Sequence, residues 1–297
     1  MTIKTILAAV ALEGHDDPVA GRAAQLAEQH GARLIALHVI EGLDAEKQYF
    51  PAHADRRAIN EILKANARDQ LKELFEKASD PAEVVVETGK PHDVIDRLIR
   101  QYAADLVVIG PGKGRTVREK MFGSTADRVV RSSPCPVLVV KKPSTRAYQQ
   151  VVAAVDFSAT SLAAAQFATT IAPTAMINLV HALEIPLTFQ QAMLKAGTPQ
   201  AEIERYRRAK AQSVREQLLA ALSQKDGIDS QGRARVMNGP ASDVLLRLAK
   251  KEQADLIALG TQGRGAVSQL VLGSVARGVV GAATCDVLAV PFPHAEV

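Results

Sequence analysis

Two stretches of the chain carry the same pattern, ADLVVIGPGK at 104–113 and ADLIALGTQG at 254–263. Each is an apolar run of strand length that follows Ala-Asp and ends at a glycine. The stretches start at residues 104 and 254, so they lie 150 residues apart, and the same shift places Gly123-Ser124 on Gly273-Ser274. A repeat of that size is a whole domain rather than a solenoid unit. The sequence therefore predicts two related domains in one chain.

The two domains are predicted at residues 1–142 and 149–297, on either side of a short polar stretch that contains Pro143. A chain of 297 residues suits two domains of ordinary size. Apolar residues make up 47% and charged residues 23%, which excludes a mainly disordered protein. The net charge of +4 comes without long runs of like charge, so no nucleic-acid partner is expected.

The amino-terminal apolar run, Ile6 to Val10, is too short for a signal peptide or a membrane span. The two cysteines, Cys135 and Cys285, are too few for a disulfide framework and indicate a reducing compartment. Both start equivalent last strands, and we expect them to be small buried hydrophobes. The expected protein is cytoplasmic and has no membrane partner.

Each domain alternates apolar runs of strand length with segments of helical periodicity. Strands are predicted at 5–10, 33–40, 83–87, 106–109 and 136–140, and again at 150–155, 176–181, 233–237, 255–259 and 286–290. Helices are predicted at 17–30, 54–79, 91–102 and 124–131, with a second long helix at 199–224. Strands that are apolar on both faces indicate a parallel sheet that helices cover on both sides. The predicted fold class is α/β, with two doubly wound domains that each hold a five-stranded parallel sheet.

A glycine-containing loop follows the fourth strand of the second domain. Gly260 and Gly263 allow backbone conformations with positive φ and the close approach of an anion. Gly273 and Ser274 mark the start of a helix, whose free N–H groups favour phosphate, and Ser274 is expected to cap that helix or to donate to a phosphate oxygen. Arg264 adds a fork of donors to the same loop. The alternative is that these glycines only form a tight turn from strand to helix.

The second domain resembles the universal stress protein family, whose nucleotide-binding branch carries the motif G-x2-G-x9-G-[S/T]. The motif here runs from Gly260 to Ser274. Val155-Asp156-Phe157-Ser158 is similar to the family's first strand, which ends in Asp, and Val180-His181-Ala182 to its second strand. Because the resemblance covers nearly the whole chain, twice, the chain is identified as a tandem member of that family.

The resemblance implies a function and an assembly. It implies the strand order 3-2-1-4-5 in each domain, and a stress-response or regulatory protein whose second domain binds ATP, with or without magnesium. The implied nucleotide-binding residues are Asp156, Ala182, Gly260, Gly263, Arg264, Gly273, Ser274 and Val275. It also implies that the two last strands pair, so that the halves form an intrachain pseudo-dimer, which leaves a homodimer as a further step of assembly.

The first domain departs from the motif at two positions. Ala11 stands where the second domain has Asp156, and Lys113 stands where it has Gly263. The first domain therefore lacks the carboxylate at the nucleoside and carries a long side chain where the backbone approaches phosphate. We expect this domain to have lost its nucleotide or to bind it weakly.

Two other functions stay open at this point. The first is a slow ATP hydrolase, although no residue is recognisable as a base near the γ-phosphate. The second is a nucleotide-independent interaction module, which the altered first domain favours. No catalytic residue is predicted for either.

Several other polar residues are expected to be structural. The seven histidines show no metal-ligand spacing, so no metal site is expected. His38 and His181 occupy equivalent strand positions and are expected to be partly buried and hydrogen-bonded. Asp105 and Asp255 each precede a strand and are expected to be turn or cap residues.

Overall fold

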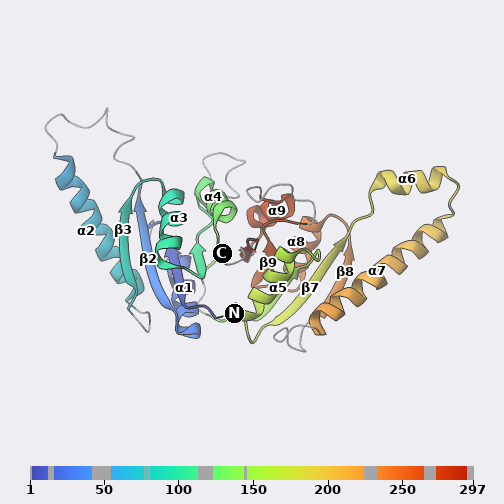
Figure 1. Ribbon diagram of the computed structural model, residues 1–297, viewed down its shortest axis with the longest axis horizontal. Helices are drawn as coiled ribbons and strands as arrows, with labels where there is room; N and C mark the ends of the chain where they lie inside the picture. The colour runs from blue at the N-terminus through green and yellow to red at the C-terminus, as the bar shows by residue number, and fades with distance from the viewer. Residues whose placement is uncertain are drawn as a thin grey trace.

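The computed structural model describes nine segments of the chain, at residues 2–12, 17–41, 55–76, 78, 81–112, 123–143, 146–223, 233–263 and 272–292. Within these residues the chain forms ten strands and nine helices, arranged as two similar halves that lie side by side (Figure 1).

Each predicted element of the first half is present. Its elements are β1 (Thr5–Ala9), α1 (Pro18–His30), β2 (Arg33–Ile40), α2 (Arg56–Phe75), β3 (Glu83–Thr88), α3 (Pro91–Tyr102), β4 (Leu106–Ile109), α4 (Ser124–Ser132) and β5 (Val137–Val139). The boundaries of α1 have local causes. Asp17 caps its start by accepting a hydrogen bond from the Val19 N–H, and Gly31 ends it in the left-handed conformation.

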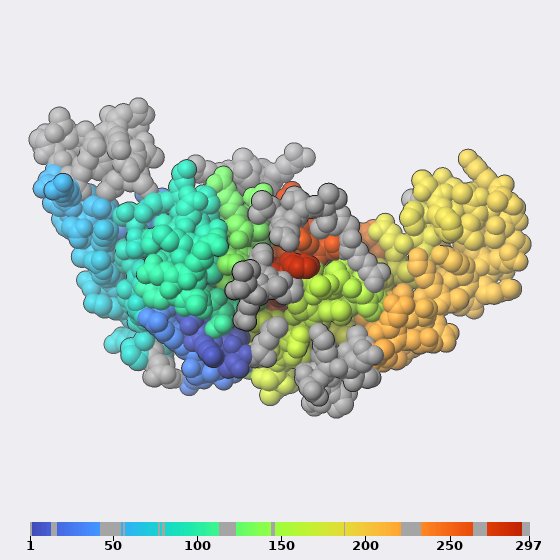
Figure 2. All heavy atoms as spheres, viewed as in Figure 1, coloured from blue at the N-terminus to red at the C-terminus, as the bar shows by residue number. Residues whose placement is uncertain are grey.

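The second half repeats this order and adds one helix. Its elements are β6 (Gln150–Ala154), α5 (Ala159–Ile171), β7 (Met176–Leu183), α6 (Leu187–Lys195), α7 (Gln200–Ser223), β8 (Arg233–Asn238), α8 (Ala241–Lys251), β9 (Leu256–Gly260), α9 (Ser274–Ala282) and β10 (Asp286–Val290). Helix α6 was not predicted. Its N-cap residue, Pro186, has no polar side chain that could cap a helix, so no capping signal in the sequence marks its start. Helices α6 and α7 project from one end of the molecule (Figure 2).

All ten strands belong to one sheet. Their order is β3-β2-β1-β4-β5-β10-β9-β6-β7-β8, so each half has the order 3-2-1-4-5 counted along its own chain. Every neighbouring pair is parallel except β5 and β10, which run antiparallel with Val139 opposite Val287 and Val137 opposite Ala289. The two five-stranded parallel sheets predicted from the sequence are thus halves of one continuous sheet (Figure 1).

Helices cover both faces of this sheet. One apolar cluster joins the sheet to α1, α2, α5 and α7, and a second joins it to α3, α4, α8 and α9. Each cluster contains residues of both halves, so the halves share their cores across the seam between β5 and β10. Parallel strands that are buried on both faces explain why the strands read as continuous apolar runs.

The two aspartates expected to be local turn or cap residues act over a longer range. Asp105 accepts hydrogen bonds from the backbone N–H groups of Lys4 and Thr5, at 2.7 and 2.9 Å. Asp255 does the same for Gln149 and Gln150, at 2.8 and 3.0 Å. Each carboxylate therefore ties the start of the fourth strand of its half to the start of the first. Both residues lie in bends before their strands, and the prediction of turn or cap residues missed these partners, which lie about 100 residues away in the chain.

The cysteines are partly buried and pack against the second apolar cluster, in line with the expectation of small hydrophobes. Desolvation raises the pKa of Cys135 to about 12 and that of Cys285 to about 11, so both are thiols at neutral pH. Because β5 and β10 are antiparallel, the two cysteines lie at opposite ends of the seam. A disulfide between them is excluded, since its Cα atoms must lie within about 7 Å.

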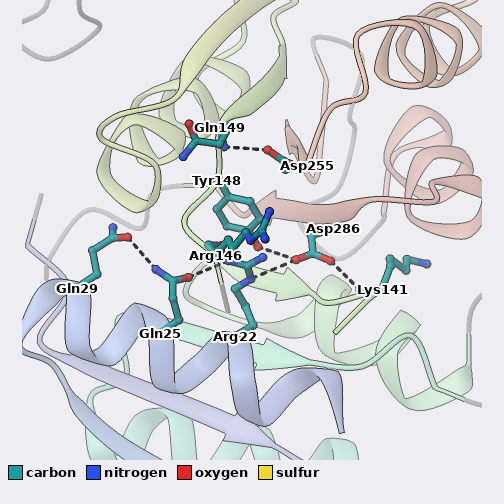
Figure 3. A network of polar contacts seen from close by, with 9 residues as sticks. All are labelled: Arg22, Gln25, Gln29, Lys141, Arg146, Tyr148, Gln149, Asp255 and Asp286. Carbon is teal, nitrogen blue, oxygen red and sulfur yellow. Dashed lines mark hydrogen bonds and ion pairs between the residues drawn. The ribbon is translucent and has the colours of Figure 1, made fainter. Parts of the chain in front are cut away.

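A buried polar cluster lies beside the seam and is drawn in Figure 3. The Asp286 carboxylate at the start of β10 accepts a hydrogen bond from the Tyr148 hydroxyl at 2.7 Å and another from the Lys141 N–H at 2.8 Å. Arg22 of α1 lies 3.4 Å from the same carboxylate, and its guanidinium also stacks over the Tyr148 ring at 4.0 Å. Arg22 donates a further bond to the Arg146 carbonyl at 2.7 Å. The cluster therefore joins the first half to the linker and to the last strand of the second half.

The cluster is almost fully withdrawn from water. Relative exposure is 3% for Arg22, 1% for Tyr148 and 3% for Asp286. This desolvation raises the pKa of the Asp286 carboxyl, although its hydrogen bonds and Arg22 act in the opposite direction. Burial likewise raises the pKa of Tyr148 well above its usual value.

A buried amide in β7 gives a prediction about stability. Asn178 is 1% exposed, and neither atom of its amide forms a hydrogen bond within the part of the chain that the structure describes. In the sheet Asn178 lies beside Val152 of β6. The equivalent residues of the first half are Ile35 of β2 and Leu7 of β1, which are both apolar. An apolar side chain therefore fits this environment. We expect Asn178→Val to raise the free energy of unfolding by about 1–3 kcal/mol, the cost of a buried unpaired polar group.

Urea denaturation of the full chain measures this change. Ile35→Val in the equivalent strand is the matched control, and it should destabilise by about 0.5–1.5 kcal/mol because it only deletes a methyl group. A loss of stability in Asn178→Val would show that the amide has a partner that matters.

Candidate functional site

A cavity of about 600 Å³ opens at the carboxyl ends of β6, β7 and β9. Open doubly wound sheets bind ligands at this edge, where the strand order reverses. Its lining includes seven of the eight residues predicted for nucleotide binding: Asp156, Ala182, Gly260, Gly263, Gly273, Ser274 and Val275. The eighth, Arg264, lies outside the described residues. Folding thus brings together residues from four separate segments of the second half.

Asp156 lies two residues after the end of β6 and shapes the start of α5. Its Oδ1 accepts hydrogen bonds from the backbone N–H and the hydroxyl of Ser158, at 2.9 and 2.5 Å. Ser158 is in turn the N-cap of α5 and accepts a bond from the Ser161 N–H at 3.2 Å. Asp156 is therefore held in place before any ligand arrives, and it has a structural role besides its place in the cavity wall.

The reason for glycine at 260 and 263 differs from the one expected. Neither residue has a positive φ. A Cβ at Gly260 would lie 2.7–2.9 Å from atoms of Thr160, and one at Gly263 would lie 2.8 Å from Asp156 Oδ2. Both glycines leave room for neighbouring side chains of the β6–α5 segment. The positive φ that glycine allows is therefore not used here, and close packing accounts for the absence of a side chain.

Of the two roles expected for Ser274, capping of α9 is not found. Gly273 is the N-cap, Ser274 is the first residue of the helix, and no side chain caps the helix. The first bond within the helix runs from the Arg277 N–H to the Gly273 carbonyl at 2.9 Å. The earlier amides of α9 have no helical partner, and they carry the positive end of the helix dipole. Since Ser274 also lines the cavity, this end of the cavity is suited to an anion.

The two histidines play the structural role that was predicted. The Nδ1 atoms of His38 and His181 lie 2.8 Å from the carbonyl oxygens of Val10 and Val155. A carbonyl can only accept, so Nδ1 carries the proton in both rings. Each histidine thereby joins the second strand of its half to the end of the first strand. His181 also lines the cavity, and its ring centroid lies 5.4 Å from that of Phe157.

Sequence reasoning missed one residue that shapes the loop. Thr160 in the first turn of α5 is 2% exposed, and its hydroxyl donates a hydrogen bond to the Gln262 carbonyl at 2.5 Å. The two residues lie 102 positions apart in the chain, so no local pattern marks their contact. Thr261 and Gln262 also line the cavity without having been predicted.

Comparison with known proteins shows the family of the chain and its fold. The profile of the universal stress protein family matches residues 2–141 and again residues 147–291. The chain belongs to the universal stress protein family. A universal stress protein of Thermus aquaticus is 33% identical over 140 residues, which is 46% of this chain and 98% of that protein. The universal stress protein E homolog of Haemophilus influenzae is 23% identical over 308 residues, which covers 98% of both chains.

A solved structure shows the same two-domain fold. A universal stress protein from Archaeoglobus fulgidus superposes with a TM-score of 0.67 at 18% identity, covering 98% of this chain and 97% of that one. At this identity the comparison establishes the fold alone. The tandem arrangement predicted from the internal repeat is confirmed by the double family match.

The first half of this universal stress protein has a cavity at the equivalent place. It measures about 1000 Å³, and Ala11, His38, Gly110, Gly123 and Ser124 are among its lining residues. The helix start is thus retained, whereas Ala11 supplies no carboxylate where the second half has Asp156. Lys113, the other departure from the motif, lies outside the described residues.

The described part of the chain holds neither a cluster of metal ligands nor a helix that could span a membrane. Within it, no three His, Cys, Asp or Glu side chains gather as a metal site would require. The helices described there are also too short or too polar to cross a bilayer.

Proposed function

We propose that the second half binds ATP in the cavity at the ends of β6, β7 and β9, with or without magnesium. The observation that supports this proposal is that the motif residues, which are far apart in the sequence, lie together around one cavity. Seven residues from distant segments line one cavity of about 600 Å³, within the range of about 300–1000 Å³ typical of small-molecule sites.

The lining of the cavity suits the parts of a nucleotide. Val155, Val180 and Leu245 give it apolar walls for a base, and Asp156 and Ala182 line it for the nucleoside. The Gly260–Gly263 loop lies next to Asp156 and, with the start of α9, offers backbone amides that favour phosphate. Arg264 would add positive charge to the loop.

Binding without rapid turnover is part of the proposal. Among the described residues that line the cavity, Asp156 is the single carboxylate, and Ser158 already occupies its Oδ1. A general base must reach the attacking water, and no residue of the motif is recognisable as a base at the γ-phosphate. We therefore infer a nucleotide-binding regulator of the stress response that acts in the cytoplasm, rather than a fast hydrolase.

The proposal also covers assembly. The antiparallel β5–β10 pair supports an intrachain pseudo-dimer of the two halves. Because each last strand is paired within the chain, its edge is no longer open to a second copy. A homodimer would need another surface, and sedimentation of the purified chain decides whether one forms.

Nucleotide extraction from the purified protein, followed by mass spectrometry, tests the proposal directly. Thermal unfolding with and without ATP adds a quantitative measure, since ATP at a hundredfold excess over its Kd stabilises the folded state by about 2.7 kcal/mol. Absence of both bound nucleotide and stabilisation would favour the interaction-module alternative. Steady release of phosphate would favour the hydrolase.

Asp156→Ala gives a specific prediction for this site. Loss of a hydrogen bond to a charged group costs about 1.5–3 kcal/mol, so ATP affinity should fall by roughly tenfold or more. The variant should also lose about 1 kcal/mol of stability, because Ser158 loses its partner at the start of α5. Calorimetric titration and denaturation measure the two effects.

A control variant at a helix cap in the first half separates the effect on ATP affinity from the effect on stability. Asp55 caps α2 by accepting bonds from the N–H groups of Arg57 and Ala58, far along the chain from the site. Asp55→Ala should cost similar stability and leave ATP affinity unchanged. Equal affinity of the Asp156→Ala variant and the parent would remove Asp156 from the site.

A further inference from the structure

The contact between Thr160 and Gln262 connects the glycine loop to the start of α5. The Thr160 hydroxyl has one proton, and the Gln262 carbonyl accepts it at 2.5 Å. Thr160 is 2% exposed and is not among the residues that line the cavity. Any effect of this threonine on a ligand must therefore act through the loop or through Ser158, whose hydroxyl lies 3.0 Å from that of Thr160 and binds Asp156.

The same threonine fits closely against the loop. A Cβ at Gly260 would meet Thr160 Oγ1, Cβ and carbonyl carbon at 2.7, 2.8 and 2.9 Å. A Cβ at Gly263 would meet Asp156 Oδ2 at 2.8 Å. The loop from Gly260 to Gly263 is thus pressed against the Asp156–Thr160 segment at both of its glycines, and the Thr160 hydrogen bond lies between these two points.

The hydrogen bond fixes the orientation of one peptide group. The peptide that joins Gln262 to Gly263 is planar and trans, so its C=O and its N–H point in opposite directions. With the carbonyl held by Thr160, the Gly263 N–H faces away from α5. Within the described residues this N–H donates no hydrogen bond, and both Gln262 and Gly263 line the cavity.

We propose that Thr160 is a positioning residue for phosphate binding. Its hydroxyl holds the Gln262 carbonyl out of the cavity and so presents the Gly263 N–H to a phosphate oxygen of the ligand. Without that bond the peptide loses this restraint, and a carbonyl dipole turned toward the ligand would repel an anion. This inference rests on the proposed binding of a nucleotide and names a residue that the sequence motif does not include.

The test compares three variants of the full chain. Thr160→Val removes the hydroxyl and keeps the branched shape, whereas Thr160→Ser keeps the hydroxyl. Thr169→Val is the matched control, because the Thr169 hydroxyl donates to the Gln166 carbonyl at 2.7 Å on the same helix, nine residues further along. Calorimetry gives the affinity for ATP, competition against ATP gives that for adenosine, and thermal unfolding gives stability.

The expected result is a selective loss. Thr160→Val should bind ATP about tenfold more weakly, while its affinity for adenosine changes by less than about twofold, because adenosine has no phosphate for Gly263 to bind. Thr160→Ser should bind ATP within about twofold of the parent. Thr169→Val should keep full affinity at a similar melting temperature to Thr160→Val.

Three outcomes would overturn the inference. Unchanged ATP affinity in Thr160→Val would show that the loop holds its orientation by itself. Equal losses for ATP and adenosine would show a general structural role instead. A parent protein that binds neither ligand would refute the proposed function, and the role of Thr160 with it.

Discussion

Titration of the intact chain with ATP is expected to give one tight site per chain, located in the second half. Binding to the first half should be weaker by more than about a hundredfold. The estimate combines two losses of about 1.5 kcal/mol each, one for the missing carboxylate at Ala11 and one for the side chain of Lys113. Both losses act on the same ligand, so they compound.

The structure gives a physical reason for the two changes to occur together. A side chain at Gly263 would collide with Asp156 Oδ2, which lies 2.8 Å from the position of its Cβ. Glycine at this position therefore leaves room for the carboxylate, which a side chain would have to displace. With Ala11 in place of the aspartate, that constraint is gone in the first half. Loss of the nucleoside contact thus also removes the demand for glycine in the loop.

Variants in each half identify which site is tight. Ser274→Ala should weaken the measured ATP affinity, whereas Ser124→Ala, at the equivalent position of the first half, should leave it unchanged. Gly263→Lys, which copies the first half, should abolish tight binding in calorimetry. Two equal tight sites per chain, or a tight site that responds only to Ser124→Ala, would contradict the assignment.

Asp286→Ala is expected to be the most destabilising single change considered, lowering the free energy of unfolding by about 3–5 kcal/mol. The substitution leaves the Arg22 guanidinium buried without its counter-charge, and it deprives the Tyr148 hydroxyl of its acceptor. Both groups are almost completely buried, so water cannot replace the lost partner. The Lys141 N–H loses an acceptor as well.

Chemical denaturation of the full chain tests this with two comparisons. Asp127→Ala breaks a partly exposed ion pair with Arg131, at 3.0 Å, and should cost less than about 1 kcal/mol. The double variant Arg22→Met with Asp286→Leu removes both charges and should recover much of the lost stability, because a buried ion pair often contributes little over apolar residues. An Asp286→Ala variant as stable as the parent would show that the cluster does not hold the halves together.

The positions of strands and helices followed from the sequence, because the forces that set them act locally. Runs such as 33–40 are apolar on both faces and have only one way to be buried, as strands between two helical layers. Asp17 and Gly31 mark the two ends of α1 through bonds to residues within one turn. The internal repeat and the spacing of Gly260, Gly263 and Gly273 also lie in the sequence, and they indicated the family that the profile match confirms.

The tertiary structure decided which contacts form between segments that are far apart in the chain. The reason for glycine at 263 is the Asp156 carboxylate, and the partner of Gln262 is Thr160, 102 residues away. The seam cluster likewise joins Arg22 to Asp286, which no periodicity or cap can connect. A sequence pattern reports the burial and local conformation of each segment. Which side chains meet across a sheet edge depends on register and close packing, and these exist only once the whole chain has folded.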